Sequence, residues 1–214
     1  MVAYLCASMR PGYGYTHSFY LHKATTMKYM VCMALAAGLA LAPAAQAQAE
    51  PPSFNYVQLT GQHVNGSAVD GWGWGAEASF NPAGGWFVSG NYRRANHVAD
   101  TGASLDAWHA DAGYAVDLID TLAVYGKLGW SKQTVDGFGE DSGMHYEAGL
   151  RVRLPLVQLE GGVGRYARNG GFNEYSARAL FHVLPFTYVG VGYVTDDYSR
   201  GSIDRWQAGV RLTF

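Results

Sequence analysis

Two histidine–carboxylate pairs lie within this chain, His109 with Asp111 and His145 with Glu147. In an extended strand, residues two positions apart share one face, so each pair could act together. Histidine beside a carboxylate is an arrangement suited to general acid–base chemistry. No nucleophile elbow, metal-ligand spacing or extra loop domain accompanies the pairs. We therefore expect them to be ordinary polar side chains of a protein interior, and we expect the protein not to be an enzyme.

Other candidate sites carry weaker chemistry. Asp196 and Asp197 suit a solvated turn better than a catalytic pair or a calcium site. The glycine-rich run 161–171 is followed by no helical pattern, so phosphate binding is not expected. Both cysteines, Cys6 and Cys32, precede the main part of the chain, which leaves no disulfide framework and no cysteine metal site there. We expect no cofactor, no metal and, since no basic patch is present, no nucleic-acid partner.

Charged residues recur on the polar face of the alternating segments described below. Buried ions are costly unless they are paired and hydrogen-bonded. We therefore predict an ionic network in the protein interior, centred on Glu147, Glu160 and Arg178. The inward charged positions are Glu77, Arg93, Lys127, Glu147, Arg151, Arg153, Glu160, Arg178, Arg205 and Arg211.

The elements that must position these residues are strands. Apolar and polar residues alternate with period two over most of the chain after Pro52, and no segment of ten or more residues shows a 3.6-residue period. The pattern predicts an all-β protein with ten strands, and eight strands are the alternative. The expected strands are 54–64, 72–80, 86–94, 104–116, 121–131, 143–154, 156–166, 174–183, 187–195 and 203–214.

The connections between these segments alternate between short turns and longer polar loops. Short connections such as NPAGG (81–85) and DLID (117–120) take turns with Gly- and Asp-rich ones such as KQTVDGFGEDSG (132–143). This alternation is typical of an antiparallel up-and-down sheet. An even number of strands returns both ends of the sheet to the side of the tight turns.

The apolar face of each strand favours a membrane barrel over a soluble sandwich. Aromatic residues fall near both ends of the strands, for example Trp108 and Tyr114 in 104–116, with small or aliphatic residues between them. Such a face matches a lipid-exposed band between two aromatic girdles. An open sheet edge in hydrocarbon would leave backbone groups unpaired, so the first strand must pair with the last. We predict a transmembrane antiparallel up-and-down β-barrel.

The segment 27–49 has the layout of a secretory signal peptide. Lys28 precedes an apolar run from Met30 to Ala42, too short for the ~20 residues of a membrane-spanning helix, and small residues ending at Ala47 or Ala49 suit cleavage. We expect residues 1–26 to be an upstream extension outside the native protein, with Met27 as its start, and 50–214 to be the barrel domain. Removing 1–49 takes away three cations and no acid, leaving twelve cations against seventeen carboxylates, a net charge of about −5.

The chain closes on RWQAGVRLTF (205–214), which alternates to its final aromatic residue. This ending resembles the signal by which the outer-membrane assembly machinery recognises unfolded barrel proteins. The residues that match it are Trp206, Val210, Leu212 and Phe214. The mature chain resembles the small monomeric outer-membrane barrels of Gram-negative bacteria, the OmpX/Ail-like and related families. Ten strands instead of eight, and shorter loops than those of adhesins, depart from that pattern.

The resemblance implies a bacterial outer-membrane protein whose partners are the lipid bilayer with its lipopolysaccharide and, during biogenesis, the assembly machinery. A monomer with a structural or cell-surface interaction role is expected, and the sequence names no partner for its surface loops. Two alternatives stay open. One is a narrow passive pore. The other is an enzyme at the barrel rim that uses His109 with Asp111 or His145 with Glu147.

Overall fold

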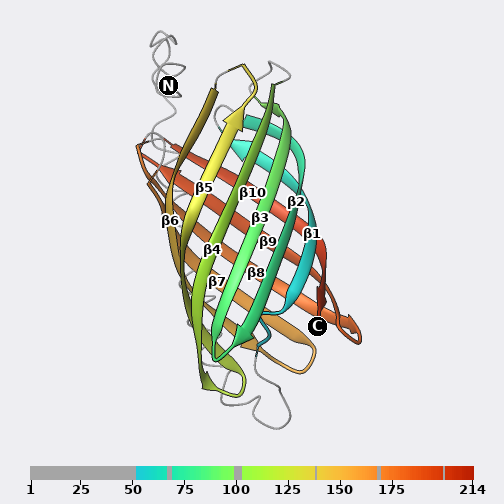
Figure 1. Cartoon of the computed structure of the whole chain (residues 1–214). Helices are drawn as coiled ribbons and strands as arrows, with labels where there is room; N and C mark the ends of the chain where they lie inside the picture. Colours follow the sequence, from blue (N-terminus) through green and yellow to red (C-terminus); the bar gives the residue numbers. More distant parts are fainter. Residues whose placement is uncertain (1–51, 67–68, 99–102, 138, 168–169, 200) are drawn as a thin grey trace.

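The chain folds into a closed β-barrel in a computed structural model that describes residues 52–66, 69–98, 103–137, 139–167, 170–199 and 201–214 (Figure 1). Residues 1–49, which include the expected signal peptide and its cleavage sites Ala47 and Ala49, lie outside the described residues. Among the described residues, no helix is long and apolar enough to cross a membrane.

Ten antiparallel strands form the barrel, each paired with its sequence neighbours. They are β1 (Tyr56–Gly66), β2 (Val69–Ala83), β3 (Trp86–Val98), β4 (Ala103–Ile119), β5 (Leu122–Val135), β6 (Gly139–Arg153), β7 (Val157–Tyr166), β8 (Phe172–Leu184), β9 (Thr187–Tyr198) and β10 (Gly201–Thr213).

The barrel closes between its first and last strands. β1 and β10 pair antiparallel along their lengths, from Tyr56 opposite Thr213 to Gly66 opposite Ile203. Every strand therefore has two hydrogen-bonded neighbours, as a sheet within hydrocarbon requires. The predicted ten-stranded up-and-down topology and its closure are confirmed, and the alternative of eight strands is wrong.

Most strands are longer than the alternation pattern predicts, and the connections are correspondingly shorter, whereas β1 keeps its predicted 11 residues and β7 has only 10. β4 has 17 residues and β9 runs on through Asp196 and Asp197 to Tyr198, into a segment expected to be a loop. A bilayer needs only about 9–11 residues of a tilted strand. Most of the extra length lies at the end opposite the tight turns, where outward residues such as Asp70, Arg94 and Glu140 are polar, although β4 gains residues 117–119 at its tight-turn end. The strands themselves, and not long loops, project from the membrane there.

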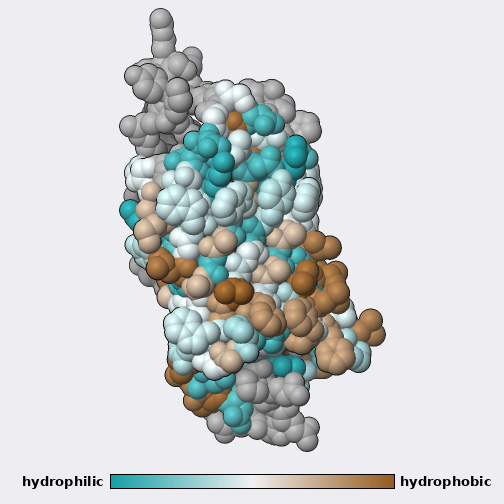
Figure 2. All heavy atoms as spheres, viewed as in Figure 1, coloured by the Kyte–Doolittle hydropathy of each residue, from teal (hydrophilic) through white to brown (hydrophobic). Residues whose placement is uncertain are grey.

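The outer surface carries an apolar belt. Large apolar side chains face outward around the barrel, among them Trp72, Trp108, Trp130 and Trp206 toward the loop end and Phe80, Trp86 and Phe181 toward the tight turns. Figure 2 shows hydrophobic side chains gathered on the lower part of the barrel and hydrophilic ones toward the loop end. Exposed apolar side chains on this scale belong in lipid. The barrel is a membrane-spanning one.

Candidate functional site: the barrel lumen

Glycines make room inside the barrel for large polar and aromatic side chains. A Cβ atom added to Gly113 would lie 2.3 Å from the Phe87 ring, and one added to Gly149 would lie 2.5 Å from the Tyr125 ring. At Gly129 it would lie 2.3 Å from the Asp111 carboxylate. These three glycines therefore occupy positions where a side chain of a neighbouring strand lies across them, so that the lumen is packed there.

One ionic cluster surrounds Glu160 on β7. Its carboxylate receives two hydrogen bonds from the Arg211 guanidinium on β10, at 2.5 and 3.0 Å, which is the bidentate geometry of strong charged pairs. Arg151 on β6 lies 3.1 Å and Arg178 on β8 lies 3.6 Å from the same carboxylate. Arg178 also pairs with Glu77 on β2 at 3.1 Å. This group, the Glu160 cluster, ties together strands from opposite walls of the barrel.

β1 contributes polar partners to the Glu160 cluster. The Tyr56 hydroxyl donates to Glu77 at 2.5 Å and accepts from Arg151 at 3.0 Å, while Arg211 donates to the Gln58 side chain at 2.7 Å. Arg211, with a relative exposure of 1%, also lies 4.0 Å above the Tyr56 ring. The charges are thus all paired, and most of them are also hydrogen-bonded, as buried ions need, although the Nε atoms of Arg151 and Arg178 lie buried without a hydrogen-bond partner.

A second cluster surrounds Lys127 on β5. Its ammonium lies 3.1 Å from Glu147 and 3.7 Å from Asp111. The Tyr125 hydroxyl donates to Glu147 at 2.7 Å. His145 Nδ1 lies 3.0 Å from an Asp111 oxygen, and both side chains are completely buried. The structure thus joins histidine and carboxylate across β4 and β6, a partnership that the spacing within each strand did not reveal.

A third cluster lies nearer the loop end. Arg205 on β10 contacts Asp196 at 2.5 and 2.8 Å and Glu174 at 3.0 Å, and Arg93 reaches Glu174 at 3.4 Å. The expectation that Asp196 lies in a solvated turn is wrong. β9 continues past it, so its side chain faces inward and is buried against Arg205.

Opposite charges are equal in number in these three clusters. Six cations pair with six carboxylates, whereas the sequence suggested an excess of cations. The cations are Arg93, Lys127, Arg151, Arg178, Arg205 and Arg211, and the carboxylates are Glu77, Asp111, Glu147, Glu160, Glu174 and Asp196.

Glu147 and Glu160 belong to separate clusters and not to one network. Along β6 and β7, Glu147 lies opposite Gly164 and Glu160 lies opposite Arg151, so the two carboxylates sit at different heights in the lumen. Arg153, also expected to face inward in the network, lies half-buried at the tight-turn end, where its amide donates to the Thr121 carbonyl.

The segment before β1 fills the lumen at the tight-turn end. Phe54 is buried, stacks on Phe87 with ring centroids 4.7 Å apart, and meets the Tyr125 ring edge-on at 5.7 Å. The Arg151 guanidinium lies 4.0 Å above the Phe54 ring and donates to the Ser53 carbonyl at 2.9 Å. The segment that leads into β1 therefore also blocks the lumen at the tight-turn end.

Stacked rings fill the lumen toward the loop end. His145 stacks on Tyr166 at 4.1 Å, Tyr166 on Phe172 at 4.6 Å, and Phe172 on Tyr198 at 4.5 Å. For the inward rings at the tight-turn end, alternation along the strands already gave a signal. Phe87 beside Trp86, and Tyr125 beside Val124, place one aromatic or apolar residue on each face, so one of the two must point inward.

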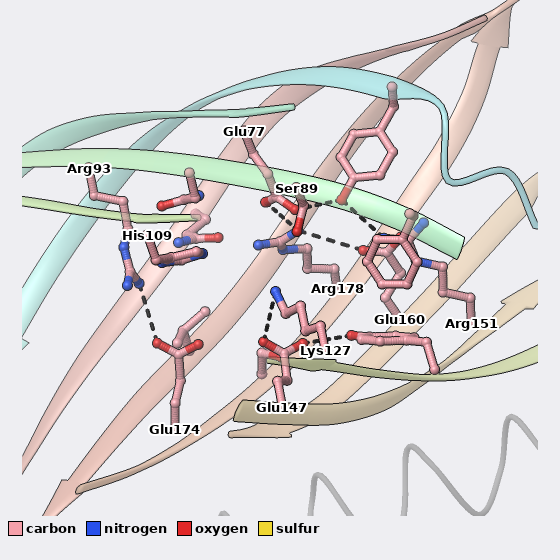
Figure 3. Close-up of a pocket in the computed structure, with 17 residues that line it drawn as sticks. Glu77, Ser89, Arg93, His109, Lys127, Glu147, Arg151, Glu160, Glu174 and Arg178 are labelled. Carbon is pink, nitrogen blue, oxygen red and sulfur yellow. Dashed lines mark hydrogen bonds and ion pairs between the residues drawn. The ribbon is translucent and has the colours of Figure 1, made fainter. Parts of the chain in front are cut away.

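A small polar cavity remains between the clusters, with a volume of about 50 Å³. Figure 3 shows Glu77, Arg93, Lys127, Glu147 and Arg178 pointing into it from several strands, with the Arg93–Glu174 and Lys127–Glu147 pairs at its walls. A buried water needs roughly 10–15 Å³ of such volume. The cavity therefore has room for a few water molecules. Within the described part of the chain, no group of three or more His, Cys, Asp or Glu residues is arranged to hold a metal ion.

The residues of the expected assembly signal lie on the outer surface of β10 and just after it. Trp206, Val210, Leu212 and Phe214 are all exposed on the lipid side, while Arg205 and Arg211 on the same strand point inward. The last strand therefore presents an apolar face to the membrane and supplies two arginines to the lumen.

No protein-family model matches this chain, and no curated protein matches it. Solved structures do match. Neisserial surface protein A is 18% identical, with 76% of this chain and 98% of that chain covered and a TM-score of 0.40. The NanC porin is 13% identical, with 74% and 100% covered and a TM-score of 0.48.

The outer membrane protein Ail of Yersinia pestis also matches, at 12% identity and a TM-score of 0.36, with 74% of this chain and 95% of that chain covered. The likeness to Ail-like barrels that the strand pattern predicts is confirmed as a likeness of architecture. At these identities the likeness concerns the fold alone, and the roles of such proteins do not transfer with it.

Proposed function

We propose that this chain is an integral protein of the bacterial outer membrane with a closed, non-conducting lumen and a structural or cell-surface interaction role. The observation that carries the proposal is the complete pairing of charges across the lumen. An open aqueous pore solvates its lining charges, whereas here Glu160 and Arg211 hold each other in bidentate contact from distant strands.

Packing at both ends of the lumen supports the same proposal. Phe54 fills the tight-turn end, and the ring stack from His145 to Tyr198 fills the other side of the clusters. Barrels of about eight strands have interiors that side chains just fill. Two more strands widen the interior slightly, and the long inward arginines take up that width. The cavity of about 50 Å³ is a pocket for water and is too small for a nutrient molecule.

The position of the histidines supports a non-enzymatic role. An enzyme at the barrel rim needs its acid–base pair open to substrate. His145 and Asp111 are completely buried, and His109 lies 3.7 Å from Asp111 with only 11% of its side chain exposed. The histidine–carboxylate pairs are instead part of the packed interior, where Asp111 contacts both His145 and Lys127.

Conductance tests the proposal against the passive pore. The purified wild-type barrel, reconstituted in planar lipid bilayers, should show no large steady conductance. A steady, ohmic conductance would favour the pore.

A second assay addresses the enzyme alternative. Outer-membrane lipids incubated with the wild-type protein and with His109→Ala should give identical mass spectra. A modified lipid that disappears with His109→Ala would favour catalysis.

A further inference from the structure

Large apolar side chains at the tight-turn end extend beyond the strands and onto the turns. Leu156, in the turn between β6 and β7, has a relative exposure of 72%. Leu184 and Phe186, at the turn between β8 and β9, have exposures of 63% and 68%, and the C-terminal Phe214 has 65%. We call these four residues the apolar rim. A turn that stands in water would normally carry polar residues.

Backbone hydrogen bonds make the apolar rim continuous. The His182 amide on β8 donates to the Leu156 carbonyl at 3.0 Å, which places the first turn against β8. The Thr213 amide on β10 donates to the Phe186 carbonyl at 2.8 Å, which places the second turn against the C-terminus. Figure 2 shows hydrophobic side chains continuing from the barrel wall to the lower right edge, where Figure 1 places the C-terminus.

The backbone at Phe186 gives independent evidence that this side chain has a role. Phe186 is the one non-glycine residue in the described chain with a positive φ, 62°. It follows Pro185 in a two-residue turn, and a turn with proline first and a positive φ second favours glycine at the second position. The β2–β3 turn meets the same need with Gly84 and Gly85. A bulky residue in this conformation is strained. If the ring were exposed to water, no favourable contact would offset that strain.

The other two tight turns differ in chemistry. The β4–β5 turn sets Leu118 between the exposed Asp117 and Asp120, and the β2–β3 turn begins at the half-buried Asn81 and ends on its two glycines. Leu118 is 55% exposed, less than Leu156, Leu184 or Phe186, so the tight turns with the most exposed apolar residues lie on the side of the barrel formed by β6 to β10.

We propose that the apolar rim is a lipid anchor that inserts into the acyl chains of the periplasmic leaflet, so that the barrel tilts toward its β6–β10 side. Continuity with the lipid-facing belt identifies the occupant, because Leu212 and Phe181 on the adjoining strands already face the bilayer. Insertion removes the exposed apolar area from water and explains why a strained phenylalanine occupies the tip of a turn.

Site-directed spin labelling tests the anchor. Both cysteines of the chain lie in residues 1–49, so the mature barrel offers single-cysteine variants without a background thiol. Leu156→Cys and Phe186→Cys report on the apolar rim, and Asp120→Cys is the matched control in a polar turn at the same end. Each folded, nitroxide-labelled protein is reconstituted in phosphatidylcholine vesicles. Collision with oxygen, which concentrates in the bilayer, is compared with collision with a water-soluble nickel chelate.

Labels at 156 and 186 should collide more with oxygen than with nickel, and the label at 120 should show the reverse. Nickel accessibility at 156 and 186 equal to that at 120 would place the turns in water and overturn the proposal. Protection from both reagents would indicate a protein partner or a second copy, and would overturn it as well. If Phe186→Cys does not fold, Leu184→Cys reports on the same turn.

Discussion

Glu160 is the centre of one of the three ionic clusters in the lumen, because three arginines from three strands meet at its carboxylate. Replacing it with glutamine keeps the shape but removes the charge that Arg151, Arg178 and Arg211 share. Breaking a buried pair by removing one partner typically costs roughly 3–5 kcal/mol. For a chain of this length, such a loss lowers the unfolding temperature by on the order of 10 °C.

We predict that Glu160→Gln unfolds at a clearly lower temperature than the wild type in detergent, as measured by the heat-dependent shift in gel migration. Asp120→Asn is the matched control, since it makes the same chemical change in an exposed turn. Asp136, another acidic residue outside the membrane belt, is a poorer control because it accepts a hydrogen bond from Ser104. Equal effects of the two substitutions would indicate a solvated lumen and would favour the pore.

At the scale of the strand, replacing a glycine with alanine has different consequences on the two faces of the sheet. A methyl group at Gly149 would point into the lumen, 2.5 Å from Tyr125 and 2.6 Å from the Gly161 carbonyl. A methyl group at Gly90 would point toward lipid, where its nearest neighbour is the His109 carbonyl at 3.7 Å.

Gly149→Ala should therefore destabilise the barrel by about 1–3 kcal/mol, the usual effect of overpacking a filled core. Gly90→Ala should be close to neutral. Thermal unfolding of the two variants in the same detergent checks the difference. Similar stabilities would contradict the packed lumen that the inward glycines accommodate.

The last strand, β10, closes the barrel by pairing with β1 and also carries the expected assembly signal. Its final residue, Phe214, exposes its ring toward the membrane and donates its amide to the Asn55 carbonyl at 3.2 Å. We predict that deletion of Phe214 slows or abolishes insertion, because the terminal strand is the expected recognition signal and its lipid-facing ring is lost.

The measurement for the Phe214 deletion is the amount of heat-modifiable barrel in outer-membrane fractions. Phe80→Ala removes an exposed ring at the same end of the barrel and leaves the terminal strand intact. A normal level of folded barrel in the deletion variant would argue against terminal recognition. A comparable loss in Phe80→Ala would assign the effect to lipid contact alone.

For the whole molecule, the expected signal peptide predicts which residues remain in the mature protein. Phe54, only a few residues after the expected cleavage sites at Ala47 and Ala49, is already buried in the barrel. We predict that residues 1–49 are absent from the mature protein. Intact-mass measurement of the purified outer-membrane form should find an N-terminus at Gln48 or Glu50. A mass that includes Met1 would contradict this.

The sequence alone determined the architecture, because alternation depends only on local geometry. Side chains point to opposite faces at successive positions, so the apolar face, the two aromatic zones and the inward parity of residues such as Arg211 can be read along the chain. Ten alternating segments and the need to pair every backbone group in lipid then require closure between the first strand and the last.

Only the tertiary structure decided which charges meet. The alternation of faces along each strand predicts that Glu160 and Arg211 both point inward. Their contact across the lumen depends on the stagger between strands, which the alternation does not encode. The same stagger separates Glu147 from Glu160 and brings Asp111 to His145. The sequence also left the ends of the strands undetermined. A polar residue such as Asp196 is typical of a loop, and only the structure shows that a buried arginine, Arg205, pairs with it inside the barrel. Pairing across a closed barrel is a long-range property, and it follows from register and not from spacing.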